Sequence, residues 1–219
     1  MKRFGRDILF KETIRQEAKG YHKLKKQTGG PGQFAVVELR VRPLERNGGF
    51  RFIDSIVEGK IPSAFIPSVE KGVREALAKG VLAEYPVADL EVELIDGAHH
   101  RKDSHARDFQ FAAAMALRDA LGRARPALLE PIGAFETACP TASLGWVLGQ
   151  LAARRARVRG TDFRDGLYVV QADLPLLELA GFEPELKNAT SGAGSCTVRP
   201  SHDDLMPEDV MAEVLRQRK

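Results

Sequence analysis

The order of hydrophobic patterns after residue 126 constrains the fold of this chain more than any other feature. Segments of alternating and of helical period predict a strand near residues 130–138, a helix near 141–154, strands near 158–163 and 167–172, a short helix from Pro175 and a last strand near 195–199. The order β-α-β-β-α-β is that of a split βαβ unit of the ferredoxin-like type. We therefore expect a ferredoxin-like βαββαβ domain in this half of the chain.

The first half of the chain also mixes strands and helices. Residues 33–42 alternate between apolar and charged side chains, and residues 50–53 resume an extended pattern after the turn at 47–49. We therefore expect these two strands to pair as a hairpin. Further periodic segments predict a helix at 67–79, a strand at 87–95 and a long helix at 104–125. We therefore expect a mixed fold of helices and strands, in the broad α/β class and of the α+β type.

A domain boundary is expected near residues 125–128. Pro126 ends the long helical pattern, and a new compact pattern starts directly after it. The predicted organisation has three parts: residues 1–10 as the end of a preceding domain or an added leader, residues 11–125 as a first domain, and residues 126–219 as a second.

Composition excludes several classes of protein. Hydrophobic residues make up 43% of the 219 residues, and no apolar stretch approaches the roughly 20 residues of a membrane-spanning helix. The N-terminus lacks the apolar run of a secretory signal, so we expect a cytoplasmic location and no membrane partner. The two cysteines lie outside any C-x-x-C pattern, which is typical of reduced thiols. A net charge of +3 is too small to identify a nucleic-acid partner, so the local distribution of charge has to decide.

A basic segment that runs into a glycine-rich loop is the first candidate for RNA binding. Its residues are Lys23, Lys25, Lys26, Gly29, Gly30, Gly32 and Gln33. Glycines allow a loop to approach a phosphate backbone closely and to donate backbone N–H groups. A solvated face followed by an ordinary turn is the alternative. The loop is not a P-loop, because Gly-x-x-x-x-Gly-Lys-Ser/Thr occurs nowhere in the chain, so we expect no GTP binding and no cofactor.

The second candidate is the polar loop before the long helix. Its residues are His99, His100, Arg101 and Lys102. Histidine can stack on bases while arginine and lysine bind phosphates, which favours RNA. A zinc-dependent enzyme site is the rival, but the first two histidines are adjacent and no further ligand has suitable spacing, so we expect no metal. A simple surface loop remains the other alternative, and either Asp103 or Ser104 is expected to cap the helix.

An arginine cluster follows the helix at 141–154. Arg154 and Arg155 end this helix, and Arg155, Arg157 and Arg159 then alternate as the chain enters a strand. The cluster is either a ridge that meets phosphates or a strand edge that charge protects from association. No nucleophile elbow and no recognisable Cys–His pattern occurs, so we expect no enzyme active site in this chain.

An ordered set of short motifs resembles the landmarks of a known family. They are QTGGPGQF at 27–34, GKIP at 59–62, FIPSVEKG at 65–72, DG at 96–97 with His100 and DS at 103–104, LLEPI at 128–132 and ARR at 153–155. Their order and spacing are similar to those of the fourth and fifth domains of elongation factor G, over about residues 10–207. Residues 11–14 resemble the strand by which the third domain of that family leads into the fourth.

The resemblance implies both a fold and a function. Residues 11–125 would form a unit similar to the second domain of ribosomal protein S5, and its tip would enter the small-subunit decoding region to promote tRNA and mRNA translocation. The second domain would lie near large-subunit RNA. One tip loop would contain Gly29, Gly30, Gly32 and Gln33, and the other His100. GTP and Mg²⁺ would bind in an N-terminal domain that this chain lacks.

Departures from the family pattern favour a divergent paralogue. His99 stands where an aromatic residue is usual, Lys102 where valine is usual and Ala156 where glycine is usual, while Pro200 is expected to interrupt the last strand. Ribosome protection or rescue, and a stand-alone RNA-binding module, are therefore the alternatives to translocation.

Overall fold

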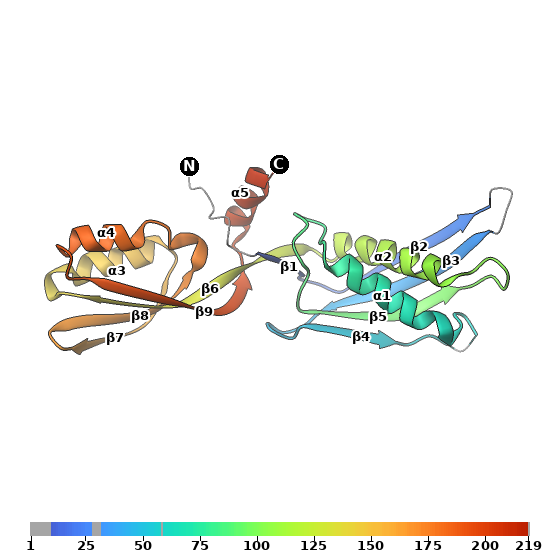
Figure 1. Ribbon diagram of the computed structural model, residues 1–219, viewed down its shortest axis with the longest axis horizontal. Coiled ribbons are helices and arrows are strands. Elements are labelled where there is room, and N and C mark those ends of the chain that lie inside the picture. Colours follow the sequence, from blue (N-terminus) through green and yellow to red (C-terminus); the bar gives the residue numbers. More distant parts are fainter. Residues whose placement is uncertain (1–9, 28–31, 58, 219) are drawn as a thin grey trace. The chain divides into compact units, whose positions relative to one another are not determined.

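The chain divides into two compact units, each with its own sheet and helices (Figure 1). The computed structural model describes residues 10–27, 32–57 and 59–218. The N-terminal unit contains residues 11–129 and, after the chain returns, residues from Leu205 onward; the C-terminal unit contains residues 130–204 together with Phe10. The expected second domain, residues 126–219, differs from this division at its end, because the chain from Leu205 groups with the N-terminal unit.

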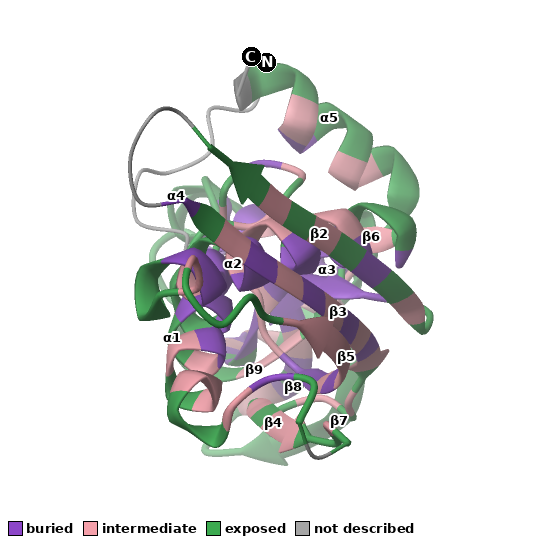
Figure 2. Cartoon of the chain, turned by 90° about the vertical axis from the view of Figure 1, so that its right-hand side faces the viewer, coloured by how far each residue is buried: buried purple, intermediate pink, exposed green. Residues whose placement is uncertain are grey.

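The N-terminal unit is a sheet with two helices on one face (Figure 1). Its strands follow the order β2-β3-β5-β4, with bounds β2 (Ala18–Lys26), β3 (Gln33–Pro43), β5 (Leu90–Ala98) and β4 (Phe50–Asp54). The helices are α1 (Ile66–Leu77) and α2 (Ala106–Arg123). β3 has the alternation expected of a half-covered strand, and Figure 2 shows its buried and half-buried residues in turn.

The core of this unit lies between the sheet and the helices. Val37, Leu39 and Val41 of β3 are fully buried beneath apolar residues of α2, among them Phe109 and Leu117. Each such side chain contributes about 2 kcal/mol by leaving water. The other face of the sheet, which carries the alternate residues of each strand, is therefore free of helices.

The hairpin predicted between residues 33–42 and 50–53 is wrong. β5 lies between β3 and β4, antiparallel to the first and parallel to the second. Asp89 explains the arrangement, since its carboxylate accepts hydrogen bonds from the Gly49 amide and from Arg46, both at 3.1 Å. These contacts hold the turn after β3 against the start of β5. The chain then passes through α1, which supplies the crossover that parallel neighbours need.

Two elements of the N-terminal unit were missed in the sequence. β2 was interpreted only as a basic segment, because Gly20 and His22 occupy inward positions that apolar residues usually fill. Gly20 has no room for a Cβ, which would collide with the backbone of Ala116 in α2. The second missed element is α5 (Glu208–Arg218), in which Val214 is buried and Glu208 pairs with Arg15 at 2.7 Å.

The C-terminal unit has the predicted ferredoxin-like topology. Its elements are β6 (Pro126–Cys139), α3 (Leu144–Ala153), β7 (Arg157–Arg164), β8 (Leu167–Pro175), α4 (Phe182–Ala189) and β9 (Ser195–Leu205). The strand order β9-β6-β8-β7 is that of a split βαβ sheet. The start of β6 belongs to the N-terminal unit, where it pairs with β1 (Lys11–Ile14).

Two local expectations in this unit are wrong. The chain after Pro175 forms only a 3₁₀ turn (Leu176–Glu178), and α4 begins at Phe182 after Gly181, whose φ of 82° favours glycine. Pro200 does not interrupt the last strand, because β9 continues through it to Leu205. An edge strand tolerates proline, since one side of its backbone has no ladder partner.

No helix within the described ranges is long and apolar enough to cross a lipid bilayer.

Candidate nucleic-acid interface

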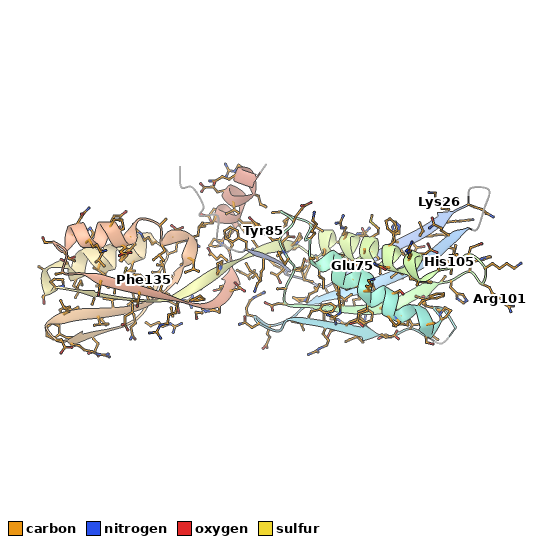
Figure 3. The ribbon with its side chains drawn as sticks, viewed as in Figure 1. Lys26, Glu75, Tyr85, Arg101, His105 and Phe135 are labelled. Atoms are coloured by element: carbon orange, nitrogen blue, oxygen red, sulfur yellow. The ribbon has the colours of Figure 1, made fainter. Side chains whose placement is uncertain are left out.

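The two candidate loops lie at the same end of the N-terminal unit. Lys26 at the end of β2 pairs with Gln33 at the start of β3, and Ala98 at the end of β5 pairs with Val36. The loops that leave β2 and β5 therefore emerge from one edge of the sheet. Figure 3 shows Lys26 and Arg101 at this end, which we call the tip.

Hydrogen bonds tie the polar loop before α2 to the start of β3 at the tip. The Ser104 hydroxyl donates to the Phe34 carbonyl at 2.6 Å and accepts from the His100 amide at 2.8 Å. The Phe34 amide donates to the Asp103 carbonyl at 2.9 Å. Ser104 thus braces the polar loop against β3, while the N-cap of α2 is His105, so the predicted capping by Asp103 or Ser104 is wrong.

Gly32 lies close to the Asp103 side chain of the polar loop before α2. It is buried, and a Cβ at this position would lie 2.8 Å from the Asp103 carboxyl carbon. Gln33 is exposed, and its side-chain amide donates to the buried carboxylate of Asp108 at 3.1 Å. The remaining glycines of this candidate loop, Gly29 and Gly30, lie outside the described residues.

The tip histidines use one ring nitrogen each for contacts within the protein. Nδ1 of His100 lies 2.8 Å from the Asp103 carboxylate, and the His100 side chain is 54% exposed. Nδ1 of His99 lies 3.1 Å from the carbonyl oxygen of Lys60. In both rings these contacts leave Nε2 for an external partner, which is the role that a positioned histidine plays toward RNA.

Lys60 anchors the tip from a third segment. Its ammonium lies 2.8 Å from the carboxylate of Asp96, and its carbonyl holds His99. The Lys60 ammonium, with the Gly97 amide, holds the pKa of the Asp96 carboxyl below its ordinary value of 3.8. The neighbouring Ile61 is buried and packs on Gly97, so this segment is fixed in place.

The cations of the tip are exposed to solvent. Among the residues that the structure describes, no acidic side chain forms an ion pair with any of them: Lys23, Lys25, Lys26, Arg101 and Lys102. The nearby carboxylates of Asp103 and Asp108 already have partners. The tip therefore presents a positive surface of the kind that binds a polyanion.

The arginine cluster of the C-terminal unit is used differently. Arg155 makes two hydrogen bonds with Glu130, at 2.6 and 2.8 Å, and a third with Glu178 at 3.2 Å. These contacts raise the pKa of Arg155, with the hydrogen bonds to Glu130 as the main cause. Arg154 pairs with Glu185 at 2.6 Å and lies over the ring of Phe182. Both guanidinium groups therefore serve contacts within the unit.

The remaining arginines of this cluster lie on β7. Arg157 is exposed, whereas Arg159 pairs with Asp173 of β8, where an irregularity between Val158 and Gly160 breaks the expected alternation. The structure therefore brings together Gly32, Gln33, the polar loop before α2 and the lysines of β2. Within the arginine cluster of the C-terminal unit, only Arg157 is without an internal partner among the described residues.

Within the described part of the chain, no group of three or more histidine, cysteine, aspartate or glutamate side chains is placed so that it could hold a metal ion. Burial raises the pKa of the thiols of Cys139 and Cys196, which disfavours the reactive thiolate form.

The sequence motifs contained Ser104, Asp103 and Lys60 but did not predict that these residues brace the tip. Each of them also has a partner far along the chain, and no local pattern indicates such pairs. The GKIP motif at 59–62 could have indicated the role of Lys60, because it places this lysine beside the apolar Ile61 in an otherwise irregular segment.

Comparison with known families decides the assignment. Residues 6–125 match the family described as "Elongation factor G, domain IV", and residues 127–214 match "Elongation factor G C-terminus". The chain belongs to the elongation factor G family. It therefore corresponds to domain IV and the C-terminal region of a translation elongation factor.

Individual relatives agree with this membership. Elongation factor G of Aquifex pyrophilus is 43% identical over 211 residues, which cover 96% of this chain and 30% of that protein. The elongation factor G-like protein of Thermotoga maritima is 42% identical over 213 residues, which cover 97% and 31%. A crystal structure of a Thermus thermophilus protein has a TM-score of 0.84 at 37% identity and covers 97% of this chain and 32% of that one. The chain thus spans about a third of the length of these elongation factor G relatives.

Proposed function

We propose that this chain is the ribosome-binding part of an elongation factor G-type translocase. The tip enters the decoding region of the small subunit, beside tRNA and mRNA, and the C-terminal unit lies against RNA of the large subunit. Such a role places the protein in the cytoplasm. The observation that carries the proposal is the exposed group of tip cations that have no acidic partner among the described residues.

The role of the tip is electrostatic and steric. Lysine and arginine release counterions when they neutralise phosphates, which gives binding energy without sequence readout. The hydrogen bonds of Ser104 and Asp103 hold the polar loop against β3, so the tip can occupy space that tRNA would otherwise re-enter. No bond is made or broken there. GTP and Mg²⁺ act through the N-terminal part of full-length family members.

A divergent paralogue that protects or rescues ribosomes is the second candidate. One contact favours it: His99 makes a polar contact with the Lys60 carbonyl where the family usually has an aromatic residue. The Thermotoga maritima relative, at nearly the same identity as the Aquifex pyrophilus one, carries the name elongation factor G-like protein.

Co-sedimentation with purified ribosomes tests the proposal. The 219-residue chain should bind at low salt and dissociate as salt rises. The double variant Arg101→Gln/Lys102→Gln should bind about tenfold more weakly, since it removes two phosphate partners. The matched control is Lys71→Gln/Lys79→Gln, which removes the same charge from exposed positions in and after α1. Absence of binding by the unmodified chain would remove the proposal.

A second experiment separates translocation from the alternatives. In a full-length protein that carries the GTPase domain, His100→Ala should slow translocation while GTP hydrolysis stays nearly unchanged. Equal loss of both activities would assign His100 to folding. Unchanged translocation, together with lost clearance of a stalled ribosome, would favour the paralogue.

A further inference from the structure

The helix-free face of the N-terminal sheet has two different halves. Away from the tip, its charges neutralise one another. Arg42 contacts Glu17 at 2.9 Å, Glu91 at 3.0 Å and Glu93 at 3.1 Å, and Arg40 contacts Glu93 at 3.1 Å. The Ser55 hydroxyl, followed by Arg40 and Arg42, lowers the pKa of Glu93. This half is a closed network that offers no free charge to a ligand.

The half next to the tip combines exposed lysines with aromatic and apolar side chains. Strand register places Tyr21 opposite Glu38, Lys23 opposite Val36, and Lys25 opposite Phe34. Residues paired in this way share a face, and the buried residues of β3 occupy the opposite, helix-covered face. Tyr21, Lys23, Lys25, Phe34 and Val36 therefore lie on one helix-free surface.

The exposure of these residues makes the surface available to a ligand. Tyr21 is 51% exposed, both lysines are exposed, and Phe34 and Val36 are half-buried. The ring of Phe34 lies 6.2 Å from that of His100, so the surface is continuous with the tip. Neither Lys23 nor Lys25 has an acidic partner within the described ranges.

The chemistry of this surface matches single-stranded RNA. An exposed aromatic ring stacks on any unpaired base, and lysines at neighbouring positions of the same face meet the phosphates of the same strand. A duplex would present phosphates to the lysines but no unstacked base to Tyr21. The positive charge of the lysines also excludes a basic peptide as the ligand.

The sheet of the C-terminal unit supplies an internal comparison. Its helix-free face carries Arg159 and Arg199, with Glu136, Gln171 and Thr197 around a depression of about 270 Å³. Its aromatic pair, Phe163 and Tyr168, lies on the other face, because Tyr168 packs against the helix-covered core. Among the described residues, the helix-free face of this sheet therefore has charged side chains but no aromatic ring for stacking.

We propose that Tyr21, Lys23, Lys25 and Phe34 form a binding surface for single-stranded RNA that extends from the tip along β2 and β3, with Tyr21 as the stacking residue. The proposal rests on the proposed function, which makes ribosomal or messenger RNA the partner. It adds that the bound RNA is single-stranded. In this proposal, an RNA strand that extends from the tip binds along this face of β2 and β3.

Fluorescence anisotropy of the complete chain with labelled oligoadenylate tests the surface directly. Tyr21→Leu should weaken binding by about tenfold, within the range for one stacked base, while Tyr21→Phe should retain it. Lys23→Gln/Lys25→Gln should reduce the slope of log affinity against log salt by about 1.4, as expected for two single-strand phosphates. The matched control is Phe111→Leu, which removes an equally exposed ring, 51%, from α2.

Several outcomes overturn the proposal. Equal affinity of Tyr21→Leu and the unmodified chain would show that Tyr21 does not stack. Tighter binding to a matched duplex than to the single strand would assign the lysines to duplex phosphates. Equal loss in Phe111→Leu, or in Tyr21→Phe, would assign the effect to folding or to the hydroxyl group.

Parallel co-sedimentation keeps this test separate from that of the proposed function. If the chain binds oligoadenylate through Tyr21 but no ribosomes, the surface stands and the translocase proposal falls. If the chain binds ribosomes through Arg101 and Lys102 while Tyr21→Leu has no effect on oligoadenylate, the tip function stands and the surface falls.

Discussion

The tip of the N-terminal unit and the arginine cluster of the C-terminal unit are both dense in positive charge, yet they use it in opposite ways. Lys23, Lys25 and Arg101 are exposed and have no acidic partner among the described residues. Arg154 and Arg155 are bound to carboxylates of their own unit. A run of basic residues therefore indicates a nucleic-acid surface only when the fold leaves its charges unpaired.

The choice of side chain fits this difference. The planar guanidinium of Arg155 matches both oxygens of Glu130, which is 2% exposed, and such a bidentate pair is suited to a partly buried site. Lysine keeps its ammonium hydrated on a flexible stem, which suits a surface that meets phosphates of variable position.

Arg155→Ala should produce the largest effect, since it leaves the buried carboxylate of Glu130 without its partner. The C-terminal unit is expected to lose about 3 kcal/mol of unfolding free energy. Urea unfolding followed by the fluorescence of Trp146, the single tryptophan, measures this unit, because Trp146 packs against its core. Arg157→Ala is the control and should change the free energy by less than about 0.5 kcal/mol. Equal losses in the two variants would contradict the contrast between paired and free arginines.

Ser104→Ala should have an intermediate effect that is confined to the tip. The substitution removes the hydroxyl that joins the Phe34 carbonyl to the His100 amide, at a cost of about 1 to 2 kcal/mol. Hydrogen exchange of the His100 and Phe34 amides should accelerate by about tenfold. Ser63→Ala, at an exposed position before α1, should leave these rates unchanged. A uniform acceleration across the N-terminal unit would show that Ser104 supports the whole core.

Lys60→Met should have the smallest effect and should depend on pH. Because the pKa of Asp96 is lowered in the folded chain, the Lys60–Asp96 pair adds stability above pH about 4 and loses it as the pH falls through the lowered pKa. Both side chains are nearly half exposed, so the contribution is below about 1 kcal/mol. NMR titration of the Asp96 carboxyl should show its pKa rise toward 3.8 in Lys60→Met and stay lowered in Lys71→Met. An unchanged Asp96 pKa in Lys60→Met would show that Lys60 is not the main cause of the lowered pKa.

Local periodicity predicted most of the fold. The alternation of β3 and the long helical stripe of α2 were visible because each buries one face against the other. The βαββαβ order of the C-terminal unit was also visible, because its strands and helices each bury one face in the core of that unit. The hairpin prediction failed because strand neighbours are chosen by contacts between distant residues, here Asp89 with Gly49 and Arg46.

The candidate site was predictable in its residue types but not in its organisation. Glycines, histidines and lysines indicated the segments that form the tip. The bond that joins the polar loop to β3, from Ser104 to Phe34, connects residues 70 positions apart and leaves no periodic signal. Likewise, the sequence contained Arg155 and Glu130 without showing that they neutralise one another.

The salt dependence of ribosome binding tests the central claim most directly, because it reports how many phosphates the protein neutralises. The tip variant Arg101→Gln/Lys102→Gln should reduce the slope of log affinity against log salt by about 1 to 2. Arg159→Gln/Arg164→Gln, which removes two arginines already paired with aspartates, should leave the slope unchanged. An unchanged slope in the tip variant, with a reduced slope in the paired-arginine variant, would contradict the account.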